Sequence, residues 1–414
     1  MLDIKFIRDN LDLCKTAAKN KNREVEWNTL LSLDDKRREL IGKAEKLRAE
    51  RNQISNKGQE TRDTRGKELK QELKMIEEEL RSTEEKFDLL MLTVPNIPDK
   101  SVPVGKDASG NVEVKKWGKI SKFGFEPKDH IELAKALDLI DFERGAKVGG
   151  SRAYFLKNEL ALLEMAVISY VFQKLVKKGY TPMTAPSLVK EFTLFGVGQF
   201  PWGRDEVYHL EKDDQYLAGT AEQTVTAYYS DEVLDESDLP KKIVAFSPCF
   251  RREAGSYGKD TRGVYRVHQF NKVEQVIISK NDMNTSFTLH EELLANAEEI
   301  LQDLELPYRV MLMCTGDMGE PQVKKYDIET WMPGRKSYGE TMSNSVMGDF
   351  QARRLKIRYK TKDGKMLFVH TLNNTAIASP RILIAILENY QQKDGSIVIP
   401  KVLQPYIGKK VIKR

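Results

Sequence analysis

The sequence predicts an α+β protein in which a helical hairpin precedes a domain built on an antiparallel sheet. Apolar residues before residue 95 repeat at coiled-coil spacing, and Pro95 and Pro98 end that pattern. From about residue 100, short β-rich runs alternate with helical segments, and no regular crossover helices separate the strands. We therefore expect two domains, residues 1–98 and residues 99–414.

The N-terminal segment has two apolar seams with alternating steps of three and four residues, which is typical of a coiled coil. The seam positions are Leu40, Ala44, Leu47, Arg51 and Ile54, followed by Leu69, Leu73, Ile76, Leu80, Thr83, Phe87, Leu90 and Val94. A break that carries Gly58 and Gly66 separates the seams and suits a turn. We expect an antiparallel pair of helices, the first from about residue 28 to residue 54 and roughly 40 Å long.

The distal half of this hairpin is rich in Lys and Arg, whereas acidic residues lie nearer its base. A cationic tip suits phosphate groups, so one interpretation is an arm that binds nucleic acid. The candidate contacts are Arg51, Lys57, Arg62 and Arg65. A spacer or dimerisation coil is the alternative interpretation, and the lack of aromatic residues at the tip argues against base stacking there.

Composition restricts the class of protein. The 414 residues include 67 Lys and Arg against 62 Asp and Glu, a net charge of +5 that is only mildly basic. The three cysteines, Cys14, Cys249 and Cys314, form no CxxC pair, so we expect neither a disulfide framework nor a cysteine-rich zinc site. The N-terminus does not resemble a signal peptide and no segment is long and apolar enough for a membrane span, so we expect a cytoplasmic protein.

The densest chemical signal lies between residues 243 and 279, where two apolar strands flank a long loop rich in Gly and Arg. Alternation along the second strand predicts that Arg266, His268, Phe270, Lys272 and Glu274 share one face. A cation, a ring and a carboxylate on one face would suit an aminoacyl adenylate. A surface hairpin with a solvated charged face is the alternative. The chain has neither a P-loop nor a strand-linked GxGxxG motif.

Residues 371–381 precede an apolar helix predicted over residues 382–390. We expect Ser379 to be the N-cap and Pro380 the first helical residue. Arg381 would then lie in the first turn, where the helix dipole disfavours a cation unless an anion is bound nearby. An Arg381 that reaches into solvent is equally compatible with the pattern.

Two shorter signals carry hydroxyl and carboxyl groups. Thr220 precedes Ala221 and Glu222, and the simplest interpretation is a helix cap followed by an acid that favours the positive helix end. Glu340 and Ser343 place a carboxylate near a hydroxyl, oxygen ligands that suit Mg²⁺ bound to ATP phosphates.

Taken together, these residues resemble seryl-tRNA synthetases over essentially the whole chain. Residues 250–255, 260–263 and 266–274 are similar to motif 2 of that family, residues 372–391 to motif 3, and residues 179–186 to motif 1. The Thr-Ala-Glu element at residues 220–222 and the Lys-Val-Glu element at residues 272–274 are similar to the serine enzymes specifically. The resemblance implies the class II antiparallel sheet flanked by helices, with a coiled-coil tRNA-binding arm, working as a homodimer.

The resemblance also implies functional roles. Arg251 and Arg381 would be catalytic, and the expected partners are L-serine, tRNA(Ser) and, as a second candidate, tRNA(Sec), with ATP as substrate and Mg²⁺ as cofactor. The implied ATP-binding residues are Arg251, Arg252, Glu253, Arg266, Val267, Phe270, Glu340, Thr341, Met342, Ser343 and Arg381. The implied serine-binding residues are Thr220, Ala221, Glu222, Glu274 and Thr375, and the implied metal ligands are Glu340 and Ser343.

One segment departs from the family pattern. After Glu340 the family usually reads Ser-Ser-Cys-Ser from the second position onward, whereas this chain has Met342 and Asn344 beside Ser343. Two other functions stay open from the sequence: a synthetase-like ligase that loads a carrier protein, and a non-catalytic RNA-binding relative. The cationic arm disfavours the first alternative, and the joint presence of Arg251, Glu274, Glu340 and Arg381 disfavours the second.

Overall fold

The computed structural model describes residues 1–54, 59–256 and 262–414, with no side chains described for residues 55–64 and 256. This part of the chain divides into two compact units, Met1–Pro95 and Asn96–Arg414. None of the helices in the described residues combines the length and apolarity needed to cross a membrane.

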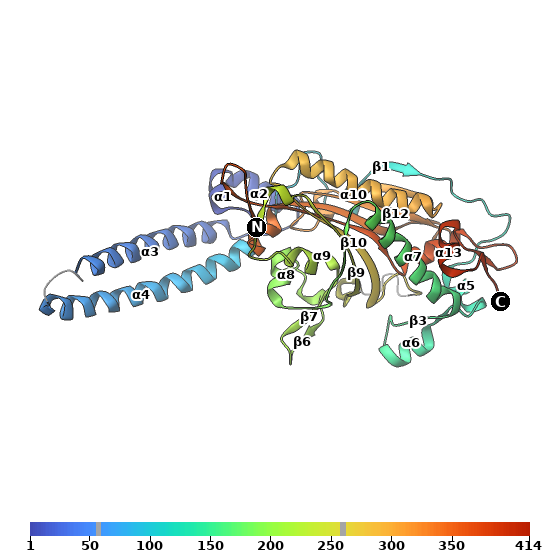
Figure 1. Ribbon diagram of the computed structural model, residues 1–414, viewed down its shortest axis with the longest axis horizontal. Coiled ribbons are helices and arrows are strands. Elements are labelled where there is room, and N and C mark those ends of the chain that lie inside the picture. The colour runs from blue at the N-terminus through green and yellow to red at the C-terminus, as the bar shows by residue number, and fades with distance from the viewer. Residues whose placement is uncertain (55–58, 257–261) are drawn as a thin grey trace. The chain divides into compact units, whose positions relative to one another are not determined.

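The first unit contains α1 (Ile4–Asp9), α2 (Leu11–Asn20), α3 (Trp27–Ile54) and α4 (Gln59–Leu92). Helices α3 and α4 lie side by side and run in opposite directions, as the sequence predicted (Figure 1). The buried seam residues are Leu40, Ala44, Ile54, Leu69, Leu73, Thr83, Phe87 and Val94. Arg51 is exposed, so its assignment to the seam was wrong, because a guanidinium group keeps its hydration at the helix surface.

The break between the two helices is shorter than we expected. Helix α4 begins at Gln59, so Gly66 lies inside the helix and not in the turn. A glycine in a helix interior costs roughly 0.5–1 kcal/mol relative to alanine, and the Glu, Lys and Arg residues around it favour helix strongly enough to outweigh that cost. The turn prediction therefore failed at Gly66.

The second unit is built on an eight-stranded sheet, as counted over the described residues, in the order β1-β11-β12-β13-β16-β10-β9-β4. Every neighbouring pair is antiparallel except β4 with β9, which confirms the predicted antiparallel sheet. The strands are β1 (Val112–Trp117), β4 (Thr181–Thr184), β9 (Lys241–Phe250), β10 (Gln269–Ser279), β11 (Tyr308–Leu312), β12 (Lys324–Met332), β13 (Ser337–Gly348) and β16 (His370–Ala378).

Helices cover both faces of this sheet, and strand alternation decides which residues meet them. On β10, Val273 and Ile277 pack into the core that contains α7 (Asn158–Lys177) and α10 (Met283–Asp303). Val276 and Ile278, which point the other way, pack with α9 (Ala221–Ala227) and α11 (Phe350–Leu355). Glu274 has the parity of Val276, so it belongs to the face covered by α9 and α11.

The remaining elements surround these layers. The other helices are α5 (His130–Ala136), α6 (Phe142–Gly149), α8 (Glu191–Val197), α12 (Arg381–Asn389) and α13 (Gln404–Ile407). Two small sheets are two-stranded: β2 (Ile140–Asp141) pairs with β3 (Phe155–Leu156), and β17 (Ile397–Val398) pairs with β18 (Val411–Ile412). In a third, β7 (Gln215–Leu217) lies between β5 (Leu188–Val189) and β6 (His209–Leu210). In a fourth, β14 (Arg358–Lys360) lies between β8 (Val233–Asp235) and β15 (Met366–Phe368).

Helix α12 begins one residue later than the sequence suggested. Its N-cap is Pro380 and Arg381 is its first helical residue, so the assignment of Ser379 as N-cap was wrong. The Ser379 hydroxyl donates to the Glu164 carboxylate of α7 instead. A carboxylate is a stronger acceptor partner for a hydroxyl than a neutral group, which accounts for the different hydrogen bond.

Candidate active site

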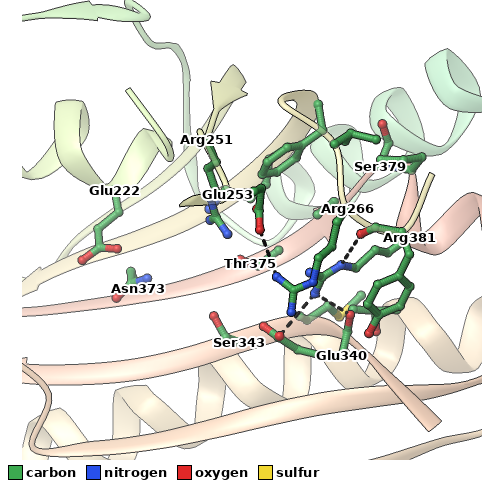
Figure 2. A pocket seen from close by; sticks show the side chains of 18 of the residues that line it. Glu222, Arg251, Glu253, Arg266, Glu340, Ser343, Asn373, Thr375, Ser379 and Arg381 are labelled. Atoms are coloured by element: carbon green, nitrogen blue, oxygen red, sulfur yellow. Dashed lines mark hydrogen bonds and ion pairs between the residues drawn. The ribbon is translucent and has the colours of Figure 1, made fainter. Parts of the chain in front are cut away.

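A cavity of about 240 Å³ opens on the sheet face that carries Phe270 and Lys272. Its walls come from β10, β13, β16, the start of α12 and the segments on either side of residues 257–261. A second cavity of about 490 Å³ adjoins it, because Arg251, Glu253, Arg266, Glu340 and Arg381 line both. Figure 2 shows that these side chains converge from separate segments of the chain.

One end of the cavity is organised by a buried carboxylate, Glu274. Its two oxygens accept hydrogen bonds from Asn373 Nδ2 at 3.0 Å and Thr375 Oγ1 at 3.1 Å, and Lys272 Nζ lies 2.6 Å away. A bulge in the pairing of β10 with β16 brings Glu274 directly opposite Thr375. Within the described residues, Asn373 Oδ1 accepts no hydrogen bond although it is buried. This end of the cavity is therefore polar and has a hydrogen-bond acceptor that a ligand could use.

Glu222 lies at the same end, on the first turn of α9. Thr220 caps this helix by accepting the Glu222 amide at 3.2 Å, as the simpler interpretation of the sequence predicted, and it also accepts a hydrogen bond from Lys272 Nζ at 2.6 Å. Ala221 is buried behind them and does not line either cavity. Burial, reinforced by the nearby Glu274 carboxylate, raises the pKa of Glu222 to about 7.

The other end of the cavity is cationic. Arg266 pairs with Glu253 at 2.9 Å, and Arg381 pairs with Glu340 at 3.2 Å while its Nε donates to the Tyr265 carbonyl at 3.1 Å (Figure 2). Burial alone would raise the pKa of Glu340, but the cations Arg381, Lys325 and Arg251 outweigh burial and lower it. Glu340 is therefore ionised near neutral pH, and each of the two arginines at this end has a carboxylate partner with which a bound polyphosphate would compete.

Arg251 and Phe270 lie between the two ends. The Arg251 guanidinium is 5.2 Å from the centre of the Phe270 ring, a cation–π contact, and its Nε donates to the Gly219 carbonyl at 3.4 Å. Both side chains line the cavity, together with Val267, Thr341, Met342 and Ser343. Arg252 is exposed and lines neither cavity.

Strand alternation did not place every side chain correctly. The sequence suggested that Arg251 and Glu253 share a strand face, but β9 ends at Phe250 and Glu253 has a φ of +53°. Because both residues lie beyond the end of β9, strand parity does not explain why both side chains line the cavity. His268 lies before β10, outside the strand to which the alternation assigned it, and its Nδ1 lies 3.0 Å from the Arg251 carbonyl oxygen.

Sequence reasoning missed three residues that the fold brings to the acidic end. Lys272 was recognised on the right face but was given no role, although alternation from Phe270 to Glu274 could have assigned one. Asn373 had no signal of its own, because its contact with Glu274 depends on the β10–β16 register. Gln351 of α11 donates to Glu222 at 2.9 Å across a long stretch of sequence.

The oxygen donors of Glu340 and Ser343 are compatible with a divalent cation that arrives with a nucleotide. Mg²⁺ commonly takes one or two protein carboxylates and completes its shell with phosphates and water. Asp327 lies opposite Ser343 in the β12–β13 register, and its buried Oδ1 has no hydrogen-bond partner within the described residues. Searched over those same residues, the structure contains no group of three His, Cys, Asp or Glu that could hold a metal by itself.

The candidate arm residues have different environments. Arg51 is exposed, whereas Arg65 forms ion pairs with Glu50, Glu68 and Glu72 at 3.0 to 3.2 Å. Lys57 lies outside the described residues, and so does the side chain of Arg62.

Comparison with known proteins gives consistent matches along the chain. Residues 1–98 match the seryl-tRNA synthetase N-terminal domain, and residues 206–390 match the tRNA synthetase class II core domain (G, H, P, S and T). A serine–tRNA ligase of Deinococcus radiodurans is 46% identical over 415 residues, covering 99% of this chain and 98% of the relative.

Two solved structures have the same fold. A seryl-tRNA synthetase from Pyrococcus horikoshii complexed with ATP superposes with a TM-score of 0.92 at 41% identity, covering 100% of this chain and 99% of that one. A cytoplasmic serine–tRNA ligase from Naegleria fowleri in complex with AMP superposes with a TM-score of 0.90 at 33% identity, again over 100% and 99% of the two chains.

Proposed function

The chain belongs to the seryl-tRNA synthetase family, and from this premise we infer that it is a serine–tRNA ligase. It activates L-serine with ATP to form seryl adenylate and diphosphate, then transfers the seryl group to the 3′ end of tRNA(Ser) and releases AMP. The observation that carries this function is the two-ended cavity. Glu274, Thr375 and Asn373 form a polar end suited to a small hydroxy amino acid, and Arg266 and Arg381 form a cationic end suited to a polyphosphate.

In the first step the serine carboxylate attacks the α-phosphorus and diphosphate leaves. Arg251 lies between the ends, where its charge stabilises the negative charge that develops on the α-phosphate. Phe270 stacks on adenine, beside the Val267 backbone. Arg266 and Arg381 hold the terminal phosphates, so the leaving group departs into a cationic environment.

The acidic end selects the amino acid. Glu274 and Thr375 bind the serine hydroxyl and ammonium, and Thr220 and Glu222 form the wall at the start of α9, with Ala221 buried behind it. Lys272 neutralises one of the two carboxylates there and fixes the Thr220 hydroxyl. The second step needs no protein nucleophile, because the adenylate is already activated and the fold only positions the tRNA ribose hydroxyl.

Mg²⁺ is part of the same proposal. Glu340 and Ser343 would hold it, and when bound it would neutralise phosphate charge during adenylate formation. The remaining ATP-side residues, Glu253, Thr341 and Met342, line the cavity near Glu340, whereas a role for Arg252 requires its side chain to move toward the nucleotide.

We also propose the organisation of the whole enzyme. Residues 1–98 form a helical domain whose coiled coil binds tRNA, and residues 99–414 form the catalytic domain. The enzyme works in the cytoplasm as a homodimer joined through the motif 1 region, residues 179–186, and tRNA(Sec) is a second candidate substrate.

Paired assays test the function. Serine-dependent exchange of diphosphate into ATP should occur, and it separates this function from a non-catalytic RNA-binding relative. Charging of tRNA(Ser) separates it from a ligase that loads a carrier protein. Arg251→Ala should lower exchange by about 100-fold or more, whereas Arg358→Ala on β14, away from the cavity, should leave it unchanged. A wild-type protein without serine-dependent exchange contradicts the proposal.

A further inference from the structure

A buried carboxylate outside the cavity joins three separate segments of the catalytic unit. Glu388, on α12, is fully buried, and its oxygens accept hydrogen bonds from the His130 amide at 3.0 Å and the Gly334 amide at 2.8 Å. The His130 ring also meets it, with Nδ1 at 3.1 Å from Glu388 Oε1. None of these residues lines the nucleotide cavity.

The second nitrogen of the His130 ring binds the backbone of the segment that leads into the cavity. The Val264 amide donates to His130 Nε2 at 3.3 Å. Because Nε2 accepts this hydrogen bond, the ring proton must be on Nδ1, where it donates to Glu388. The imidazole therefore transmits the fixed position of Glu388 to the backbone of Val264.

Two glycines pack closely against this ring and its carboxylate partner. Gly263 has a φ of +71°, and a Cβ added to it would lie 2.0 Å from His130 Nε2. A Cβ on Gly334 would lie 2.9 Å from Glu388 Oε1 and 2.7 Å from Asp129 Cβ. Both glycines are needed for close backbone approach, so the ring and the carboxylate are held in one arrangement.

The held segment leads directly into the cavity. Tyr265, Arg266 and Val267 follow Val264 and all line it. Arg381 Nε donates to the Tyr265 carbonyl, and the centre of the Tyr265 ring lies 4.5 Å from the Arg381 guanidinium and 4.2 Å from the Arg335 guanidinium. Arg335 follows Gly334, whose amide donates to Glu388. Glu388 therefore also supports the contact between Arg335 and the Tyr265 ring.

We propose that His130 and Glu388 are positioning residues for the nucleotide: by fixing the Val264 amide they hold Tyr265, Arg266 and Val267 in the arrangement that binds ATP. The inference rests on the proposed function, because it takes these three residues as part of the ATP site. The pair touches no substrate and acts only through the backbone. Loss of this pair should therefore weaken ATP binding and leave serine binding unchanged.

Two substitutions distinguish the two hydrogen bonds of the His130 ring, to Glu388 and to Val264. His130→Asn places an amide where Nδ1 was, so it keeps the hydrogen bond to Glu388 but is too short to reach Val264. His130→Gln extends to the Nε2 position and can still accept the Val264 amide. Lys135→Gln, an exposed position on the same helix α5, is the control. The measurements are the ATP Kd by calorimetry, the KM for serine in exchange, and Tm.

We expect the ATP Kd of His130→Asn to rise about tenfold, the factor that corresponds to about 1.4 kcal/mol. His130→Gln should stay within about threefold of the wild type, and the KM for serine should be unchanged in both. A purely structural role would lower Tm without separating the two variants in ATP affinity, and equal Kd values for Asn and Gln overturn the proposal.

Two further outcomes keep the test decisive. If His130→Asn does not fold, a folded His130→Gln with ATP binding weakened tenfold overturns the inference, as does an Nε2–H tautomer of His130 in the nitrogen NMR spectrum of the wild type. If the wild type binds ATP but shows no serine-dependent exchange, the ligase function fails while the ATP Kd values still test the positioning pair. A wild type that binds no ATP overturns both.

Discussion

The hydroxyl of Thr375 donates a hydrogen bond to the carboxylate of Glu274. Serine can join this pair through its own hydroxyl, whereas alanine would leave the pair buried under a methyl group. Sites built to bond a hydroxyl reject an analogue that lacks it, because their polar groups then lose hydrogen bonds. Threonine, in contrast, is excluded mainly by the crowding of one extra methyl group.

Thr375→Val keeps the side-chain shape and removes the hydroxyl. It should reduce serine-over-alanine discrimination by about 1–3 kcal/mol, measured as the ratio of kcat/KM in exchange with each amino acid. Thr226→Val is the matched control, because Thr226 is equally buried and its hydroxyl has no hydrogen-bond partner within the described residues. Unchanged discrimination in Thr375→Val would show that Thr375 is not a serine ligand.

Glu222 should make stability depend on pH. Its pKa is raised from 4.5 to about 7 in the folded protein, so the fold binds a proton more readily than the unfolded chain does. Ionising it as the pH rises from about 4.5 to 7 therefore lowers the free energy of unfolding. Glu222→Gln removes this effect. The free energy of unfolding of Glu222→Gln minus that of the wild type should therefore increase by about 1–2 kcal/mol from pH 4.5 to pH 8. The expected difference is modest because the Glu222 side chain is only partly buried.

Denaturant titrations of both ligand-free proteins at the two pH values measure this difference. Glu236→Gln is a useful comparison, because hydrogen bonds from Lys280 and the Lys362 amide lower the pKa of Glu236, and removing the charge should have no stabilising effect at high pH. A Glu222→Gln advantage that is the same at both pH values would contradict a raised pKa.

At the scale of elements, α3 and α4 contain glycines with no packing role. A Cβ on Gly42 or Gly66 would meet nothing within 4 Å. Gly66→Ala should therefore stabilise α4 by about 0.5–1 kcal/mol, because alanine loses less backbone entropy than glycine when the helix forms. Hydrogen exchange of α4 peptides measures the change, and slower exchange is expected. Gly198→Ala should do the opposite, because that residue has a φ of +87° and its Cβ would lie 2.4 Å from Pro321 Cγ.

The ion pairs of α3 and α4 also change which cation best tests tRNA binding. Arg65 is shared among three carboxylates, so its substitution would disturb the helices as well as any phosphate contact. Arg51 is exposed, and Arg51→Gln should weaken tRNA binding and reduce the slope of log Kd against log salt by ~1. Lys86→Gln, which removes an equal charge at an exposed position near the base of the hairpin, is the control, and an unchanged slope in Arg51→Gln would exclude a phosphate contact there.

For the molecule as a whole, the two units predict separable activities. Joining Leu31 to Val94 through a short linker removes most of α3 and α4 and leaves every residue of the cavity in place. Serine-dependent exchange should stay within a few-fold of the full chain, while charging of tRNA(Ser) should be lost. Circular dichroism and Tm establish that the deletion variant is folded, and loss of exchange in a folded variant would contradict this division of labour.

Local patterns in the sequence were sufficient for several features. Heptad spacing predicted the helix pair because side chains three and four apart share a helix face. Strand alternation from Phe270 to Glu274 predicted the active face because successive side chains point to opposite sides of a strand. Each of these periodicities is a property of a short segment and needs no knowledge of the rest of the chain.

Only the tertiary structure decided which distant segments contact one another. The β10–β16 register joins Glu274 to Asn373 and Thr375, α11 supplies Gln351 to Glu222, and α7 supplies Glu164 to Ser379, which is why the N-cap prediction failed. The left-handed Glu253 similarly has no sequence signal, and its ion pair with Arg266 joins residues 13 positions apart. The sequence by itself determined which chemical groups are present and the local faces that carry them. Their partners were decided by packing, because hydrogen bonds and ion pairs depend on distances that only the complete fold brings about.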